Sequence, residues 1–588
     1  MPFRSLALLL ALLLLWPVVS RSQEGTPVAA AGPGLPRPLV KIVETALARY
    51  TLAPQADEAD EERELRRAER GVREALSTEG YFDPKLRFEP VAQQAGPRYR
   101  LIIELGPVTR VGKVELTFSG ALTEPRFAER ARQLRDAWLL KEGTPFRSAE
   151  WEQAKLKLLA ATEQRDFADA RIVDSNAIVE PATATASLLV ELDSGPAYTV
   201  GPLQIEGLGR YESSLVERYN PFKPGDPYDR SKMLEFQQAL QDTPYFANAL
   251  ATLQTSPEQP ELVPLRVVVR ESRGKRVSTG VGVETNTGAH VEVSYRQNML
   301  FGKPWVLQSG VRLDQTGGFA YGDILLPPRR NGIQDGVGAL VEDSEIEEQR
   351  VRRWGLGAAR TRTIGPRDGN NTATKLAVNF EHEQRRTPST DWQSLNVLST
   401  TYGWTRRRVD NIVEPRSGNV IRLEGTVGAG GPSMNQTFVR GYGRVQQYVP
   451  VGARDVITVR ADLGYVQADS PDIVPSKFLF RTGGTTTVRG YDYESLGVKQ
   501  GVATVGGRAL AVGSAEYVHW LESFGGNWGL AAFVDVGDAA DSFSALDFAL
   551  GTGLGVRYRT PAGPLAVDVA YGARENHVRV HFSIAIAF

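Results

Sequence analysis

The C-terminal segment, residues 577–588, alternates between apolar and polar or small side chains, and this pattern constrains the fold more than any other feature. Its apolar positions are Val578, Val580, Phe582, Ile584, Ile586 and Phe588, and the residues between them are His577, Arg579, His581, Ser583, Ala585 and Ala587. Successive side chains of a β-strand point to opposite faces. Similar alternation in 554–558 and 565–571 predicts an all-β C-terminal half.

The N-terminus predicts export from the cytoplasm. Arg4 precedes an apolar run, 6–15, and small residues follow at Ser20 and Ser22. This order is typical of a signal peptide over residues 1–22, with cleavage after Ser20 or Ser22. An uncleaved anchor helix is the alternative, but the run is shorter than the ~20 residues that span a bilayer. No later segment offers 18 apolar residues in a row.

A β-barrel in an outer membrane is the remaining way for such an exported chain to cross a membrane. A half-buried soluble sheet shows the same alternation. Export, the number of candidate strands, their Tyr and Trp residues and the terminal Phe588 favour a lipid-facing sheet. At roughly 20 residues per strand and connection, residues 275–588 predict an antiparallel transmembrane barrel of about 16 strands.

The first half of the chain contains a pattern that occurs three times, roughly every 80–90 residues. Each copy has a helix that ends in an aromatic turn: 61–77 before Tyr81-Phe82, 151–161 before Phe167, and 233–240 before Tyr245-Phe246. Strands are expected at 114–118 and 203–207. The pattern predicts three α+β domains of the order β-α-α-β-β, although three unrelated domains are the alternative. The opening strand of the first copy is expected near Leu39–Val43.

Composition excludes several function classes. Lys and Arg number 68 and Asp and Glu 69, so no basic excess indicates a nucleic-acid partner. The chain has no cysteine, which excludes disulfides, thiolate metal sites and thiol catalysis. Its five histidines, at 290, 382, 519, 577 and 581, are dispersed. With no nucleophile elbow, phosphate loop or zinc motif, we expect neither an enzyme nor a cofactor or metal site.

Two motifs connect the chain to a known group of proteins. Val488-Arg489-Gly490-Tyr491 follows the glycine pair Gly483-Gly484, and Phe533, Asp535 and Gly537 form an F-x-D-x-G pattern farther on. A strand and turn at 406–418 is a third signature. Together with the terminal strand, these resemble the superfamily of outer-membrane assembly factors and two-partner secretion transporters. The repeats resemble its periplasmic POTRA domains.

The resemblance implies how the motifs act and how the chain is divided. The loop with Arg489 is expected to fold into the barrel lumen, where the arginine meets Asp535 on the wall. A guanidinium binds a carboxylate through two parallel hydrogen bonds, which fixes direction as well as distance. The expected segments are a signal peptide (1–22), a linker (23–37), three POTRA domains (38–107, 108–196, 197–274) and the barrel (275–588).

The number of repeats indicates the branch of the superfamily. BamA-type insertases typically have five POTRA domains. Two-partner secretion transporters have two POTRA domains and a plug helix, and patatin-fused members have one POTRA domain. Three copies match the TamA-type subunit of the translocation and assembly module. This resemblance implies assembly of client β-barrel proteins such as autotransporters, contact with outer-membrane lipid and a TamB-like partner anchored in the inner membrane. A two-partner transporter, a BamA-like insertase and a passive porin remain alternatives.

A lateral gate is expected between the first and last barrel strands. The first strand, 277–284, contains Gly280 and Gly282, which weaken packing within a strand. The last strand has small residues on its inner face. The expected gate residues are Val277, Gly280, Val281, Gly282, Phe582, Ile584 and Phe588. A fully hydrogen-bonded seam, in which the glycines only relieve crowding, is the alternative.

Overall fold

The computed structural model describes residues 26–52, 57–91, 97–365, 369–561 and 563–584. The expected signal peptide and Phe588 lie outside the described residues. Backbone packing divides the chain into two compact units. One comprises the residues up to Gln204 with 221–234 and 251–266. The other comprises 205–220, 235–250 and everything from Val267 onward.

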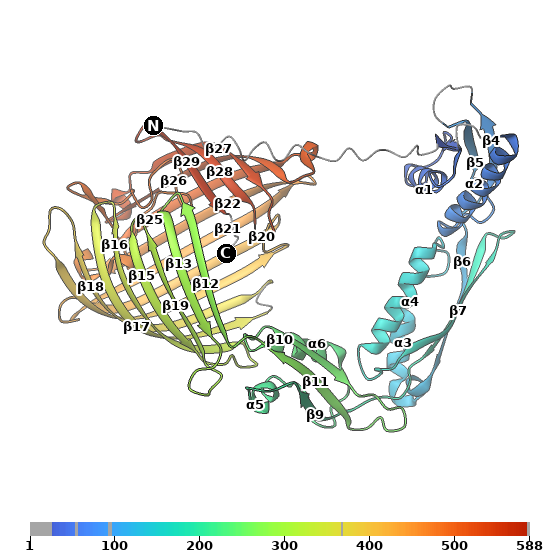
Figure 1. Cartoon of the computed structure of the whole chain (residues 1–588), viewed down its shortest axis with the longest axis horizontal. Helices are drawn as coiled ribbons and strands as arrows, with labels where there is room; N and C mark the ends of the chain where they lie inside the picture. Colours follow the sequence, from blue (N-terminus) through green and yellow to red (C-terminus); the bar gives the residue numbers. More distant parts are fainter. Residues whose placement is uncertain (1–25, 53–56, 92–96, 366–368, 562, 585–588) are drawn as a thin grey trace. The chain divides into compact units, whose positions relative to one another are not determined.

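Three small α/β domains occupy the first half, and all have the predicted β-α-α-β-β order (Figure 1). The first contains β2 (Ala29–Ala31), α1 (Arg37–Leu47), α2 (Glu58–Thr78), β4 (Lys85–Pro90) and β5 (Tyr99–Glu104); the second β6 (Arg110–Ser119), α3 (Ala128–Asp136), α4 (Ser148–Glu163), β7 (Arg171–Glu180) and β8 (Thr185–Asp193); the third β9 (Val200–Glu206), α5 (Ser213–Glu217), α6 (Arg230–Gln241), β10 (Phe246–Leu253) and β11 (Val263–Glu271). In each sheet the last strand lies in the middle. A short pair, β1 (Thr26–Pro27) and β3 (Thr51–Leu52), precedes the second helix.

The start of the first domain differs from the prediction. The expected strand near Leu39–Val43 is wrong, because those residues lie in α1, where Leu39, Val43 and Leu47 are buried at helical spacing. Pro38 fits the first turn, which needs no backbone N–H donor. The prediction of a linker over residues 23–37 is also wrong in part. Its alanines 29–31 form β2, which pairs in parallel with β5. The pairing is made by backbone groups, so three successive alanines gave no alternating pattern from which to predict a strand.

Helix α2 shows how the local sequence builds these domains. The Asp57 carboxylate accepts a hydrogen bond from the backbone N–H of Asp60, which caps the helix N-terminus. Ala68, Val72 and Leu76 lie four residues apart and are fully buried. Gly80, with a φ of 93°, follows the helix end in the left-handed conformation that glycine adopts without strain. The charged residues between them are exposed or partly exposed to solvent.

The second half is a single antiparallel sheet of 16 strands, paired in sequence order, which confirms the predicted barrel. Its strands are β12 (Lys275–Glu284), β13 (Gly288–Gln297), β14 (Val306–Asp314), β15 (Gly317–Leu325), β16 (Ile333–Ile346), β17 (Gln349–Ile364), β18 (Thr372–Arg386), β19 (Gln393–Val409), β20 (Gly418–Gly430), β21 (Gln436–Val451), β22 (Asp455–Ala468), β25 (Ala509–Trp520), β26 (Trp528–Ala540), β27 (Ala549–Tyr558), β28 (Leu565–Gly572) and β29 (His577–Ile584). Along β29, Val578, Val580 and Phe582 are exposed on the outer face, whereas His581 is buried. In the described part of the chain, no helix combines the length and the hydropathy that a membrane crossing needs.

The strands alternate in direction, so hairpins fall at two ends of the barrel. We call the end at which β12 begins the near end and the other the far end. The turns 298–305 and 326–332 and the residues 365 and 369–371 lie at the near end, because each follows a strand that returns from the far end. The long connection 469–508, between β22 and β25, starts and finishes at the far end.

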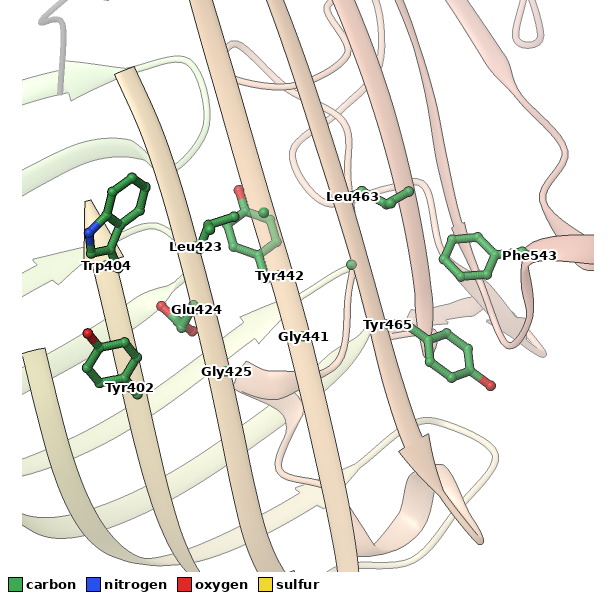
Figure 2. Close-up of a pocket in the computed structure, with 12 residues that line it drawn as sticks. Tyr402, Trp404, Leu423, Glu424, Gly425, Gly441, Tyr442, Leu463, Tyr465 and Phe543 are labelled. Atoms are coloured by element: carbon green, nitrogen blue, oxygen red, sulfur yellow. The ribbon is translucent and has the colours of Figure 1, made fainter. Parts of the chain in front are cut away.

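The outer wall contains an apolar groove of about 800 Å³ across β19–β22 (Figure 2). Its floor is made by Gly425 and Gly441, which are direct cross-strand partners and at which a Cβ atom would meet nothing within 4 Å. Tyr402 and Tyr465 continue the same row on either side. The groove therefore exists because two outward positions in the apolar wall carry no side chain.

Candidate functional site

The long loop 469–508 brings the V-R-G-Y motif into the interior of the barrel. The loop contains two short 3-10 helices (Pro471–Ile473 and Ser476–Phe478) and its own hairpin, β23 (Val498–Gln500) with β24 (Ala503–Val505). Val488 and Tyr491 are completely buried, in a cluster with Val512 of β25 and Ala549 of β27. The motif is therefore fixed against the wall and forms part of the interior of the folded barrel.

The predicted ion pair between Arg489 and Asp535 is present. The guanidinium donates from Nε to Asp535 Oδ2 at 2.7 Å and from Nη2 to Oδ1 at 3.1 Å, and the backbone N–H of Arg489 adds a third bond at 3.1 Å. Ser514 donates to the same carboxylate at 2.6 Å. Asp535 is fully buried and Arg489 is 7% exposed, so each charge depends on the other for its stability.

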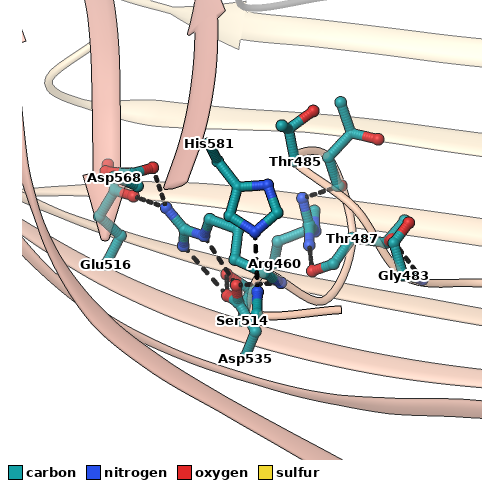
Figure 3. Close-up of polar contacts among 12 residues, drawn as sticks. Arg460, Gly483, Thr485, Thr487, Ser514, Glu516, Asp535, Asp568 and His581 are labelled. Atoms are coloured by element: carbon teal, nitrogen blue, oxygen red, sulfur yellow. Dashed lines mark hydrogen bonds and ion pairs between the residues drawn. The ribbon is translucent and has the colours of Figure 1, made fainter. Parts of the chain in front are cut away.

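Arg489 also joins a wider charge network that was not predicted from the sequence, and Figure 3 labels its partners Glu516, Asp535 and Asp568. Its Nη1 donates to Glu516 of β25 at 2.5 Å and to Asp568 of β28 at 3.1 Å. Arg557 of β27 donates to the same two carboxylates, at 2.9 and 2.6 Å. One loop arginine thus connects strands β25, β26 and β28 directly. The signal for these residues was available, because each is a charge at an inward position of an alternating strand.

The other motif residues have steric roles. Gly490 has a φ of 93°, and a Cβ there would lie 2.8 Å from the backbone nitrogen of Gly572. A Cβ at Gly537 would lie 2.9 Å from the Val488 side chain, so this glycine makes room for the loop valine. The Arg489 guanidinium lies 3.4 Å from the centroid of the Phe533 ring, a cation–π contact. The two motifs therefore fit each other residue by residue.

The tip of the loop also binds the last strand. The backbone N–H of Gly490 donates to Nε2 of His581 at 2.9 Å, and Arg579 donates to the Gly490 carbonyl at 2.9 Å. Arg579 makes two further bonds to the Asp492 carboxylate, at 2.9 and 2.6 Å. His581 and Arg579 are both on β29. The sequence placed the histidine on the lumen face but indicated no partner for it.

The opposite side of the seam is held by the same loop. Asn286, in the turn after β12, accepts hydrogen bonds from the backbone N–H and the hydroxyl of Thr485, at 3.2 and 3.3 Å. Arg460 of β22 steadies this stretch by donating to the carbonyls of Thr486 and Thr487, at 2.5 and 2.7 Å. We call residues 485–492 the clasp, because they bind both β29 and the turn that follows β12.

The seam itself has few direct contacts in the described part of the chain. No backbone ladder joins β12 to the described residues of β29. The Thr285 hydroxyl donates to the Phe582 carbonyl at 3.2 Å and accepts from its N–H at 2.7 Å. Among the described residues, most polar contacts around the seam therefore pass through the clasp.

The predicted gate residues divide into three groups. Val277 and Val281 are exposed on the outer face of β12, and Phe582 on that of β29. Gly280 has open space beside it, whereas Gly282 lies under the ring of His290, 2.6 Å from where a Cβ would be. The side chain of Ile584 and all of Phe588 lie outside the described residues. The structure shows where these residues lie, and their role in a gate stays a prediction.

Comparison with known proteins agrees with this architecture. The Omp85 superfamily domain matches residues 272–588, and a POTRA model, the surface antigen variable number repeat, matches 198–272. A crystal structure of BamA from Haemophilus ducreyi lacking POTRA domains 1–3 is similar in fold, with a TM-score of 0.65 and 17% identity over 80% of this chain and 98% of that one. CdiB from Acinetobacter baumannii is 14% identical over 90% and 97% of the two chains, with a TM-score of 0.45. The chain therefore belongs to the Omp85 superfamily, as an outer-membrane β-barrel with periplasmic POTRA domains.

Proposed function

We propose that this protein inserts or translocates client outer-membrane proteins, such as autotransporters, through a lateral opening between β12 and β29, and that it does so without catalysing a reaction. The observation that supports this proposal is the clasp. Arg579 and His581 bind it on the β29 side, and Asn286 binds it on the β12 side. A loop that holds both borders of a sparsely bonded seam is suited to control whether the seam opens.

The mechanism follows from the chemistry of a strand edge. If the contacts of the clasp to β29 and to Asn286 break, the seam can widen. The edge of β12, which no ladder joins to the described residues of β29, then offers a client backbone N–H and C=O groups that lipid cannot satisfy. A client strand can pair with this edge and enter the bilayer without exposing its own backbone to hydrocarbon. Thr285 and Phe582 make the direct contact that must break first. The ion pair of Arg489 with Asp535 would keep the loop attached to the barrel wall while the contacts of the clasp to β29 and to Asn286 break.

The three repeats support a TamA-type role within the superfamily. The sheets of the first and second repeats have edge strands, β2 and β4 in one and β6 and β7 in the other, that can accept a further strand. We propose that these edges bind a TamB-like periplasmic protein anchored in the inner membrane. Cross-linking from the first repeat in intact cells tests this. Recovery of peptidoglycan or porins alone would count against it.

A disulfide across the seam tests the gate. The chain has no native cysteine, so Thr285→Cys with Phe582→Cys gives one defined cross-link. The control pair, Val281→Cys with Val291→Cys, joins direct partners on β12 and β13 and leaves the seam free. We expect oxidation to stop client assembly only in the seam pair, and reduction to restore it. Full assembly by the oxidised seam pair would overturn the gate.

The client class needs a separate measurement. Outer membranes from cells with and without the protein can be compared by quantitative proteomics. Loss of autotransporters supports the TamA-type role. Loss of most barrel proteins would indicate a BamA-like insertase, and loss of one secreted partner a two-partner transporter. A passive porin would leave the proteome unchanged and would give large, steady conductance.

A further inference from the structure

A cavity of about 390 Å³ lies at the near end of the barrel, within the unit that contains the barrel and part of the third repeat. Its barrel side is formed by the turn 328–332 and by the end of β17. Its repeat side is formed by Tyr219, Ala239, Asp242 and Thr243. The Tyr219 hydroxyl donates to the Pro328 carbonyl at 2.8 Å, and both residues are buried, so the two sides are fixed to each other.

The lining of this cavity is strongly basic. The described residues of the lining include Arg329, Arg330 and Arg362, against one carboxylate, Asp242. Arg329 pairs at 3.2 Å with Asp335, and that carboxylate already holds Arg360 at 2.6 Å. Among the described residues, Arg330 makes one long bond, 3.4 Å, to the Asn220 carbonyl. Among the described residues Arg362 is exposed and has no ion-pair partner, so the cavity can accept an anion.

These arginines lie where the lipid-facing wall ends, at the near end of the barrel. On the outer face of β17, Trp354 and Leu356 are exposed apolar residues, and Arg360 and Arg362 follow them toward the near end. Arg406 continues this border on β19, since it is in register with Thr372, the partner of Ile364. Long basic side chains at such a border reach the level of lipid head groups.

We propose that this cavity binds the phosphate of an anionic phospholipid in the periplasmic leaflet. Arg330 and Arg362 would bind the phosphate oxygens, because a guanidinium matches a phosphate with two parallel N–H donors. The acyl chains would lie against the apolar face of β17 above them. Tyr219 and Thr243 line the same cavity, so the bound head group would contact both the barrel and the third repeat. This site is independent of how clients are handled.

Lipid binding to the full-length protein tests the proposal. The protein is purified in a neutral detergent and titrated with phosphatidylglycerol, and bound lipid is counted by native mass spectrometry. The double variant Arg330→Gln with Arg362→Gln should bind this lipid about tenfold more weakly or worse, since two charge-assisted contacts are lost. The control, Arg350→Gln with Arg352→Gln, removes two outward arginines at the far end and should bind normally.

Two further measurements keep the test decisive. Asp242→Asn removes the carboxylate of the described lining and should strengthen lipid binding. A gain in binding cannot be explained by the loss of a contact or by damage to the fold. Competition with inorganic phosphate separates the two sources of the anion. Phosphate that displaces the lipid at equal concentration would overturn a lipid site, and so would equal loss of binding in both arginine variants. Unchanged binding in Arg330→Gln with Arg362→Gln would also overturn it.

Discussion

The Nε2 atom of His581 accepts a hydrogen bond of 2.9 Å from the backbone N–H of Gly490, and this bond joins the last strand to the tip of the lumen loop. A ring nitrogen that accepts a hydrogen bond carries no proton. His581→Ala would leave a buried N–H unsatisfied, at about 1–3 kcal/mol. We expect faster hydrogen exchange at 488–492 in the full-length variant, measured by mass spectrometry.

His577 provides the matched control for that variant. It lies on β29 four residues earlier, on the same face, but it is exposed and makes no hydrogen bond to the clasp within the described part of the chain. His577→Ala should therefore leave exchange in the loop unchanged. If His581→Ala also leaves it unchanged, the bond to Gly490 contributes nothing to the position of the clasp.

Arg489→Ala should impair client assembly while the barrel still folds. Removal of one partner of a buried ion pair leaves the other charge stranded, at about 3–5 kcal/mol. Here three carboxylates, those of Asp535, Glu516 and Asp568, would lose the same cation. The strand ladders remain, so heat-modifiable migration on gels should persist. Display of a client at the cell surface should fall.

Arg489→Lys separates charge from geometry. A lysine keeps the charge but offers a single ammonium where the arginine contacts three carboxylates and forms a two-bond pair with Asp535. We expect an intermediate loss of assembly. Assembly by Arg489→Ala at the level of the unmodified protein would show that the network is not needed for function.

The junction of the third repeat with the barrel should depend on pH through Glu271. Burial alone raises the pKa of this carboxyl, but the N–H groups of Gly209, Arg210 and Tyr211 and the Arg210 guanidinium outweigh it, and the pKa falls from 4.5 to about 2. A lowered pKa in the folded state stabilises the fold above pH 4.5, and this contribution is lost as the pH falls toward 2. Glu271→Gln should lower the melting temperature at pH 7, with a smaller difference at pH 3.

Calorimetry of the full-length protein checks the Glu271 prediction. Glu258→Gln, in the exposed loop between β10 and β11, serves as the control and should melt like the unmodified protein at both pH values. A melting difference between Glu271→Gln and the unmodified protein that is as large at pH 3 as at pH 7 would contradict the linkage.

Much of the architecture could be predicted because it rests on periodic burial. Alternation along β27, β28 and β29 follows from a wall with lipid on one side, and the helices of the repeats follow from apolar residues at helical spacing. The pairing of Arg489 with Asp535 could be expected because both positions belong to motifs of the superfamily. The structure confirms these predictions.

One miss was visible in the sequence, because Leu39, Val43 and Leu47 stand at helical spacing in α1. The other misses share a physical cause, since they concern contacts made by groups that the pattern of apolar residues does not reveal. Strand β2 consists of three alanines and is defined by backbone pairing with β5. Asn286 and Thr485 are ordinary polar residues of turns, 199 positions apart, and only the fold brings them together. The partners of His581 and Arg579 were hidden for the same reason.

The ion pair between Arg579 and Asp492 offers the sharpest test of the clasp, because both side chains can be exchanged. Arg579→Asp and Asp492→Arg should each loosen the loop from β29, since each places two like charges together. The double exchange restores opposite charges and should recover part of the lost contact. Bilayer conductance of the purified protein gives the measurement: we expect more frequent openings in each single variant and fewer in the double exchange. If the increase in opening frequency of the double variant equals the sum of the increases of the two single variants, the two residues act independently. The clasp would then not depend on this pair.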